Sequence, residues 1–85
     1  MLNDEVHDLK INPDQFWAMR AGIKDFEIRA NDREFKVNDV VKLREFNGVY
    51  TGRIYLGRIT FITPFGNSGD YVVLNFKRIK LGEAV

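Results

Sequence analysis

A short helix that stops at a glycine and runs straight into a strand is the feature that most constrains this chain. Asn12 is a favourable N-cap residue, and the proline after it suits the first helical turn, where its missing N–H has no intrahelical acceptor. Gly22 suits the left-handed conformation that ends many helices. We therefore expect a helix over residues 13–21 and a strand over residues 22–29.

The expected strand alternates apolar and charged residues. Strict alternation places Phe26 and Ile28 on a buried face and the charged Glu27 and Arg29 on the opposite face. The spacing of two residues lets Glu27 and Arg29 form an ion pair. Lys24 would share the buried face, which is costly for an ammonium group, so we expect it to reach the rim or line a polar cavity.

The same segment resembles a known family signature. Its residues Gly22, Lys24, Glu27 and Arg29 are similar to the G-x-K-x-x-E-x-R signature of the ASCH domain, a branch of the PUA-like β-barrels. Runs at residues 7–10, 31–33, 37–40 and 69–74 extend the similarity to compact ASCH-like proteins of phages and bacteria. The resemblance implies an α+β, mainly β fold: a small PUA-like barrel of about five strands with one early α-helix.

The rest of the pattern fits that architecture. We expect strands over residues 6–11, 39–46, 50–63 and 71–79, with a hairpin turn at Asn47-Gly48, where both residue types tolerate positive φ. The strand over residues 50–63 is long, and a bend or bulge at Gly52 or Gly57 would help the sheet to close. A chain of 85 residues supports one core, so we expect a single domain over residues 1–85.

Charge and composition narrow the functional classes. The formal net charge is only +1, from 13 Lys+Arg against 12 Asp+Glu. Tight non-specific nucleic-acid binding is therefore disfavoured, and an RNA role would need a local basic patch or a pocket for one nucleotide. With no cysteine and one histidine, we expect no metal site, and no cofactor motif is present. Without an apolar N-terminal segment or a run long enough to span a bilayer, we expect a cytoplasmic protein with no membrane partner.

Three further residues are candidates for ligand contact, each with a structural alternative. His7 has the apolar parity of its strand, so it is either packed and hydrogen-bonded at a barrel rim or a ligand contact. Trp17 either fills the core or provides a surface on which a base stacks. Arg33, in a polar connection, is either a solvated loop residue or a contact for a phosphate or carboxylate.

The leading hypothesis is an RNA- or nucleotide-binding module. A polar pocket between the first helix and the barrel would hold one splayed base, with an aromatic ring stacking, a carboxylate accepting from an exocyclic amine, and Arg or Lys meeting phosphate. Its candidate residues are His7, Trp17, Lys24, Glu27, Arg29 and Arg33. The partners we expect are RNA, a nucleotide or a modified nucleoside.

Two alternatives stay open. The resemblance implies an amidohydrolase, because some bacterial ASCH proteins deacetylate N-acetylated cytidine with a lysine, a threonine three residues later and a distal glutamate. Lys24 matches the lysine, Glu27 occupies the threonine position, and the distal glutamate has no counterpart, so catalysis would rest on Lys24 and Glu27 as base and orienter. The other alternative is a phage or bacterial interaction module that binds a host protein through the same charged face.

Overall fold

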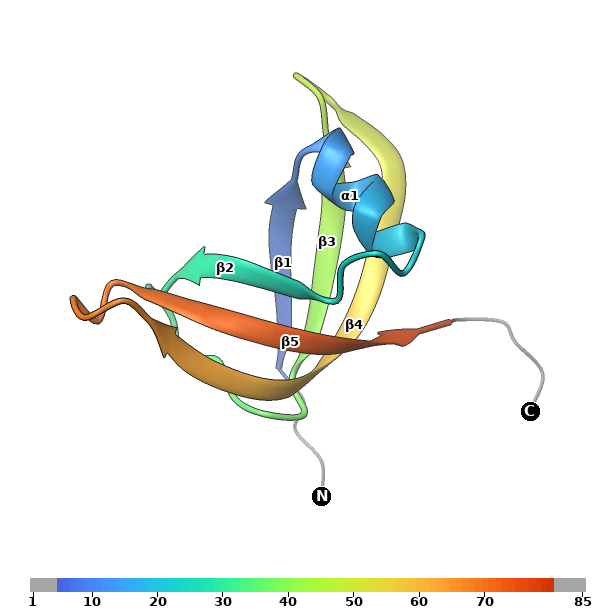
Figure 1. Ribbon diagram of the computed structural model, residues 1–85. Helices are drawn as coiled ribbons and strands as arrows, with labels where there is room; N and C mark the ends of the chain where they lie inside the picture. The colour runs from blue at the N-terminus through green and yellow to red at the C-terminus, as the bar shows by residue number, and fades with distance from the viewer. Residues whose placement is uncertain (1–4, 81–85) are drawn as a thin grey trace.

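The computed structural model describes residues 5–80 and contains five strands and one short helix (Figure 1). In chain order these are β1 (Val6–Ile11), α1 (Pro13–Arg20), β2 (Phe26–Ala30), β3 (Val40–Phe46), β4 (Tyr50–Phe65) and β5 (Tyr71–Ile79). The predicted α+β, mainly β class with five strands and one early helix is confirmed. Among the described residues, none of the helices is long and apolar enough to cross a membrane.

The strands form one curled sheet in the order β1-β3-β4-β5-β2. β1 pairs with β3 in parallel, and the other three pairings are antiparallel. The long β4 curves, so that its first half stands beside β3 and its second half runs beneath β5 (Figure 1). Backbone pairing therefore leaves β1 and β2 as the two edges of a half-barrel.

The helix begins and ends as its sequence indicates. The Asn12 side chain accepts the N–H of Gln15 at 2.9 Å, and Gly22 takes a left-handed φ of 77°. The Ala18 carbonyl then accepts N–H groups from both Ile23 and Lys24. Because the chain is still turning at these residues, the next strand starts at Phe26 rather than at Gly22.

The core lies on the concave side of the sheet, beneath α1. Helix residues Phe16 and Met19 are buried against strand residues from β1, β3, β4 and β5. The strand members of this core are Leu9, Ile11, Val41, Leu43, Tyr55, Ile59, Val72, Leu74 and Phe76. Apolar side chains from four strands and one helix thus fill the interior that the curled sheet encloses.

The sequence-based prediction of which face of β2 is buried is wrong. Glu27 is buried at 5% exposure, whereas Phe26 and Ile28 are 37% and 43% exposed. Glu27 lies opposite the fully buried Leu74 of β5, which places the charged row on the concave side. Alternation separates two faces but does not say which one is covered, and here the cationic partners of Glu27 make its burial tolerable.

The strand β4 has two irregularities in its pairing, and one of them lies at a glycine where the sequence predicts a bend or bulge. Gly52, with φ 93°, lies in a bulge where residues 51–53 of β4 face a single residue of β3. The second register shift falls between Ile59 and Phe61, not at Gly57. Gly57 instead permits close packing, because a Cβ there would lie 3.0 Å from the Phe76 Cβ. The hairpin turn after β3 is confirmed and spans residues 47–49, with β4 continuing to Phe65.

Candidate binding site

The charged residues of the signature meet in one ionic cluster. Glu27 is its centre: Lys24 Nζ donates to one carboxylate oxygen at 2.6 Å, and Arg29 Nη1 donates to the other at 3.2 Å. Lys24 Nζ also donates to the side-chain oxygen of Gln15 on α1. Both oxygens of the buried carboxylate thus accept charge-assisted hydrogen bonds, which offset its loss of hydration.

This cluster joins elements that the sheet does not pair. Arg29 Nη1 also donates to the Lys10 backbone carbonyl at 3.1 Å, so one guanidinium links the edge strands β2 and β1. Through Gln15, Lys24 links β2 to α1. The geometry supports the structural interpretation of the Glu27–Arg29 pair, because these side chains tie together the open side of the half-barrel.

A hollow of about 330 Å³ lies next to the cluster, between the end of α1 and the end of β5. We call it the basic hollow. Lys24 is the only predicted site residue that lines it, and its other lining residues are Met19, Arg20, Ala21, Gly22, Asp25, Tyr55, Phe76, Arg78 and Lys80. Four cationic side chains and one carboxylate therefore surround this space. In a chain with a net charge of +1, positive charge is concentrated here.

Tyr55 gives the basic hollow a buried phenol. Burial raises the pKa of Tyr55 above its ordinary value; Arg78 opposes this shift and Asp25 adds to it. The Arg78 guanidinium carbon lies 5.7 Å from the centre of the Tyr55 ring. The phenol is therefore neutral at physiological pH and able to donate a hydrogen bond.

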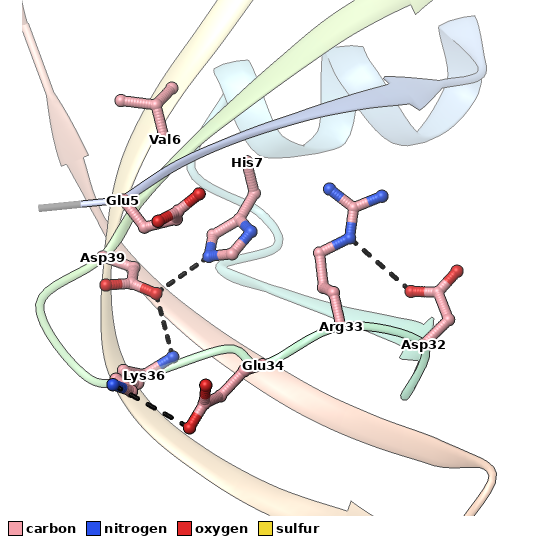
Figure 2. A pocket seen from close by; sticks show the side chains of 8 residues that line it. All are labelled: Glu5, Val6, His7, Asp32, Arg33, Glu34, Lys36 and Asp39. Atoms are coloured by element: carbon pink, nitrogen blue, oxygen red, sulfur yellow. Dashed lines mark hydrogen bonds and ion pairs between the residues drawn. The ribbon is translucent and has the colours of Figure 1, made fainter.

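A second and larger hollow, of about 530 Å³, holds His7 and Arg33 (Figure 2). His7 Nε2 lies 2.8 Å from Asp39 Oδ2, which also accepts the backbone N–H of Lys36 at 3.0 Å. The His7 ring packs against Phe35 with 4.6 Å between centroids. His7 is thus packed and hydrogen-bonded, as its structural alternative expects.

The charge around this second hollow is acidic. Four carboxylates line it, against the two cations Arg33 and Lys36. Arg33 Nε lies 3.5 Å from Asp32 Oδ1, and its side chain is 40% exposed. Arg33 also borders a smaller hollow with Arg29. A phosphate group would meet excess negative charge at the second hollow, so we call it the acidic hollow.

Trp17 belongs to neither hollow. It is 48% exposed, and its helix neighbour Phe16 fills the core in its place. Its indole meets Phe16 edge-on at 5.2 Å, and the Arg53 guanidinium carbon lies 5.3 Å from its ring centre. Arg53 is in turn fixed by the buried Glu45, with 2.7 Å between Nε and Oε1. The predicted site residues therefore fall into three places rather than one pocket.

Several residues of the observed sites do not follow from local pattern. Gln15 has the spacing of a capping box, but its side chain accepts from Lys24 across the helix–strand turn. Tyr55 and Asp39 are brought into their sites by strand register, which leaves no short-range signal. The basic cluster of Lys77, Arg78 and Lys80 is a signal for Arg78, but a cluster of this kind at the end of a strand is interpreted from sequence as a solvated edge.

Comparison with known proteins gives two matches. Residues 6–76 match the model of a family described as a domain of unknown function, DUF3850. The chain is also 34% identical over 73 residues to a protein of Escherichia phage P2 named "Uncharacterized 12.9 kDa protein in GpA 3'region". That alignment covers 84% of this chain and 67% of the phage protein.

Proposed function

We propose that this chain, which belongs to the DUF3850 family, binds RNA or a nucleotide in the basic hollow between α1 and β5. The observation that carries the proposal is the lining charge: four cations and one carboxylate around about 330 Å³. A space of this size suits one nucleotide unit rather than a folded polymer. One nucleotide would be held mainly through its phosphate.

Different residues of the lining would contact different parts of the nucleotide. The Arg78 guanidinium, at the end of β5, has the planar fork that meets phosphate oxygens in pairs. Lys24 supplies a second positive charge, held in place by Gln15 and Glu27. Phe76 and Tyr55 border the hollow but are 5% and 3% exposed, so they leave little surface for a base to stack on; the neutral Tyr55 hydroxyl is a donor.

The proposal includes a relationship to the ASCH branch of the PUA-like barrels. Two observations support it: the five-stranded half-barrel with its early helix, and the meeting of the signature residues Lys24, Glu27 and Arg29 in one cluster. The relationship makes RNA the first polymer to test, because the resemblance connects ASCH proteins with RNA-modifying enzymes.

An amidohydrolase acting on an acylated nucleoside is the second candidate. Its specific support is the 2.6 Å contact between Lys24 and Glu27 beside the basic hollow. Against it, Lys24 Nζ donates to two oxygens, so this amine is held as a hydrogen-bond donor rather than as a proton acceptor. Reversible binding requires only charged and hydrogen-bonding contacts from these residues, whereas catalysis also requires a proton acceptor.

An NMR titration with nucleotides and short single-stranded RNAs tests the proposal. We expect amide shifts in residues 19–25, at Tyr55 and at Arg78. Arg78→Ala should weaken binding about tenfold, consistent with the loss of one charged contact. Arg33→Ala, which removes a cation from the acidic hollow, is the matched control and should leave affinity unchanged.

Three outcomes decide between the alternatives. Shifts centred on Arg33 and His7, or no shifts at all, would contradict the proposed site, and the latter would make a host protein the leading partner. Turnover of an acetylated cytidine, abolished by Lys24→Ala in a folded variant, would establish the amidohydrolase instead. Reversible binding without turnover supports the binding module.

A further inference from the structure

A second cationic hollow, of about 270 Å³, opens at the bulge of the β3–β4 hairpin. We call it the hairpin hollow. Its lining includes three cations, one carboxylate, an aromatic ring and the bulge glycine, namely Lys42, Arg44, Arg53, Glu45, Tyr50 and Gly52. Glu45 is 1% exposed, and its Oε1 lies 2.7 Å from Arg53 Nε. Because this carboxylate is already paired, the hairpin hollow presents an excess of positive charge.

The cations of the hairpin hollow can still contact an anion. Within residues 5–80, Lys42 pairs with no carboxylate. Arg44 approaches Asp8 only to 3.8 Å between Nη1 and Oδ2. The Arg53 side chain is 49% exposed although it contacts Glu45. Each of the three therefore has donors that face solvent and could meet phosphate oxygens.

Trp17 and Arg53 connect the hairpin hollow to the basic hollow across α1. The Arg53 guanidinium carbon lies 5.3 Å from the centre of the Trp17 ring. Arg20 follows Trp17 by three residues, so the two side chains are neighbours on the helix surface, and Arg20 lines the basic hollow. Figure 1 shows α1 running from the side of the β3–β4 turn towards the end of β5. We call the two hollows, with Trp17 between them, the basic track.

Positive charge is concentrated along the basic track. Its two hollows are lined by seven cations and two carboxylates, whereas the whole chain has a formal net charge of only +1. The acidic hollow carries the opposite excess, with four carboxylates against two cations. Such a separation of charge attracts an anionic polymer to one side of the molecule although the total charge is nearly neutral.

The basic track also exposes aromatic surface, but outside the basic hollow. Tyr55 and Phe76, at the basic hollow, are 3% and 5% exposed, whereas Trp17 and Tyr50 are 48% and 44% exposed. The Arg44 guanidinium carbon lies 3.9 Å from the centre of the Tyr50 ring. Unpaired bases stack both on exposed rings and on guanidinium planes of this kind. Groups for phosphate and groups for bases thus follow one another along the track.

We propose that the basic track binds a single-stranded RNA segment of several nucleotides. One phosphate would lie in the basic hollow, a base on Trp17, and a further phosphate in the hairpin hollow. This inference rests on the proposed function and extends it from one nucleotide to a strand, with the hairpin hollow as a second subsite. A duplex fits less well, because its paired bases are not free to stack on side chains.

Trp17 is the only tryptophan of the chain, so its fluorescence reports contact at the middle of the track. The probes are a nucleoside monophosphate and a single-stranded oligouridylate of about six nucleotides, compared at constant salt. We expect the monophosphate to bind in the basic hollow and leave the Trp17 emission unchanged. The oligonucleotide should quench this emission and bind about tenfold more tightly, through the added stacking and phosphate contacts.

Variants of the hairpin hollow separate the two subsites. Lys42→Ala and Arg44→Ala should each weaken the oligonucleotide several-fold in calorimetric titrations and leave the affinity for the monophosphate unchanged. Circular dichroism confirms that each variant folds. Lys36→Ala is the matched control, because it removes a lysine that is 65% exposed and lines the acidic hollow. This variant should bind both ligands like the wild type.

The outcomes distinguish failure of the track from failure of the nucleotide site. An oligonucleotide that binds no more tightly than the monophosphate, or equally well to Lys42→Ala and the wild type, would overturn the track while the site in the basic hollow remains. Tighter binding of a duplex than of the single strand would overturn it as well. If neither ligand binds, the proposed function itself is wrong, and the track with it.

Discussion

The two sides of β2 differ in a way that reverses the usual pattern of a half-buried strand. Its inner side carries Glu27 and Arg29, joined to Lys24, while its outer side exposes Phe26 and Ile28. The inner charges are paired with one another, so they tolerate burial. The outer apolar residues remain partly exposed, with Lys24 Nζ lying 5.1 Å from the centre of the Phe26 ring. The comparison teaches that ionic pairing, rather than burial of apolar side chains, occupies the inner side of this edge strand.

Removing the centre of the ionic cluster should have the largest effect. Glu27→Ala would leave Lys24 and Arg29, whose side chains are 18% and 24% exposed, without their shared carboxylate. We expect a loss of about 3 kcal/mol in the free energy of unfolding, as for other broken buried ion pairs. Urea denaturation measures it. Glu34→Ala, at a carboxylate 82% exposed, is the control and should change stability little; a Glu27→Ala variant as stable as this control would contradict the structural role.

Arg29→Ala should have the next largest effect, about 2 kcal/mol, because it removes a charged hydrogen bond to Glu27 and the link to the Lys10 carbonyl. The loss should be local: hydrogen exchange of β1 and β2 amides should accelerate more than that of β4 amides. Uniform acceleration across the sheet would show that Arg29 does not specifically close the open side.

Adding a methyl group at Gly57 tests the packing on the inner side of the sheet. In Gly57→Ala the new Cβ would meet the Phe76 Cβ at 3.0 Å and the Tyr55 ring at 3.1 Å. We expect about 1–2 kcal/mol of destabilisation from this overpacking, together with weaker nucleotide binding, because both neighbours line the basic hollow. Thermal unfolding and the NMR titration measure the two effects; unchanged affinity would separate Gly57 packing from the site.

The smallest expected effect is a pH dependence from Tyr55. Burial holds its pKa above the ordinary value in the folded chain, so the unfolded chain loses this proton first as pH rises. The Tyr55 contribution to stability is therefore complete below about pH 10 and decreases above it. Urea denaturation from about pH 9 to about pH 11 should show a decline that is shallower in Tyr55→Phe. Parallel curves for the two proteins would contradict the assignment.

Much of the fold follows from local signals in the sequence. The Asn12 cap, the left-handed Gly22 and the turn at residues 47–49 depend on a few neighbouring residues, and each is found where its chemistry indicates. Asn38 takes a φ of 82°, a left-handed conformation that asparagine adopts more readily than most residues. Such features need no knowledge of distant strands.

The candidate site can be predicted from the sequence less completely than the fold, because strand register determines which residues meet there. The pattern of β2 does not reveal that Glu27 lies opposite the buried Leu74. His7 lies on the strand and Trp17 on the helix that the sequence predicts. The curl of the sheet nevertheless places the two side chains in separate surroundings. The basic run near the end of β5 reaches the basic hollow only because β5 ends beside the helix terminus.

The salt dependence of nucleotide affinity tests most directly the claim that cations of the basic hollow, rather than those of the acidic hollow, contact the ligand. We predict that the logarithm of the association constant for a short single-stranded RNA falls linearly with the logarithm of salt concentration. In Arg78→Ala the slope should be smaller by about one. Arg33→Ala should retain the wild-type slope. Equal slopes for Arg78→Ala and the wild type, with a reduced slope for Arg33→Ala, would contradict the account.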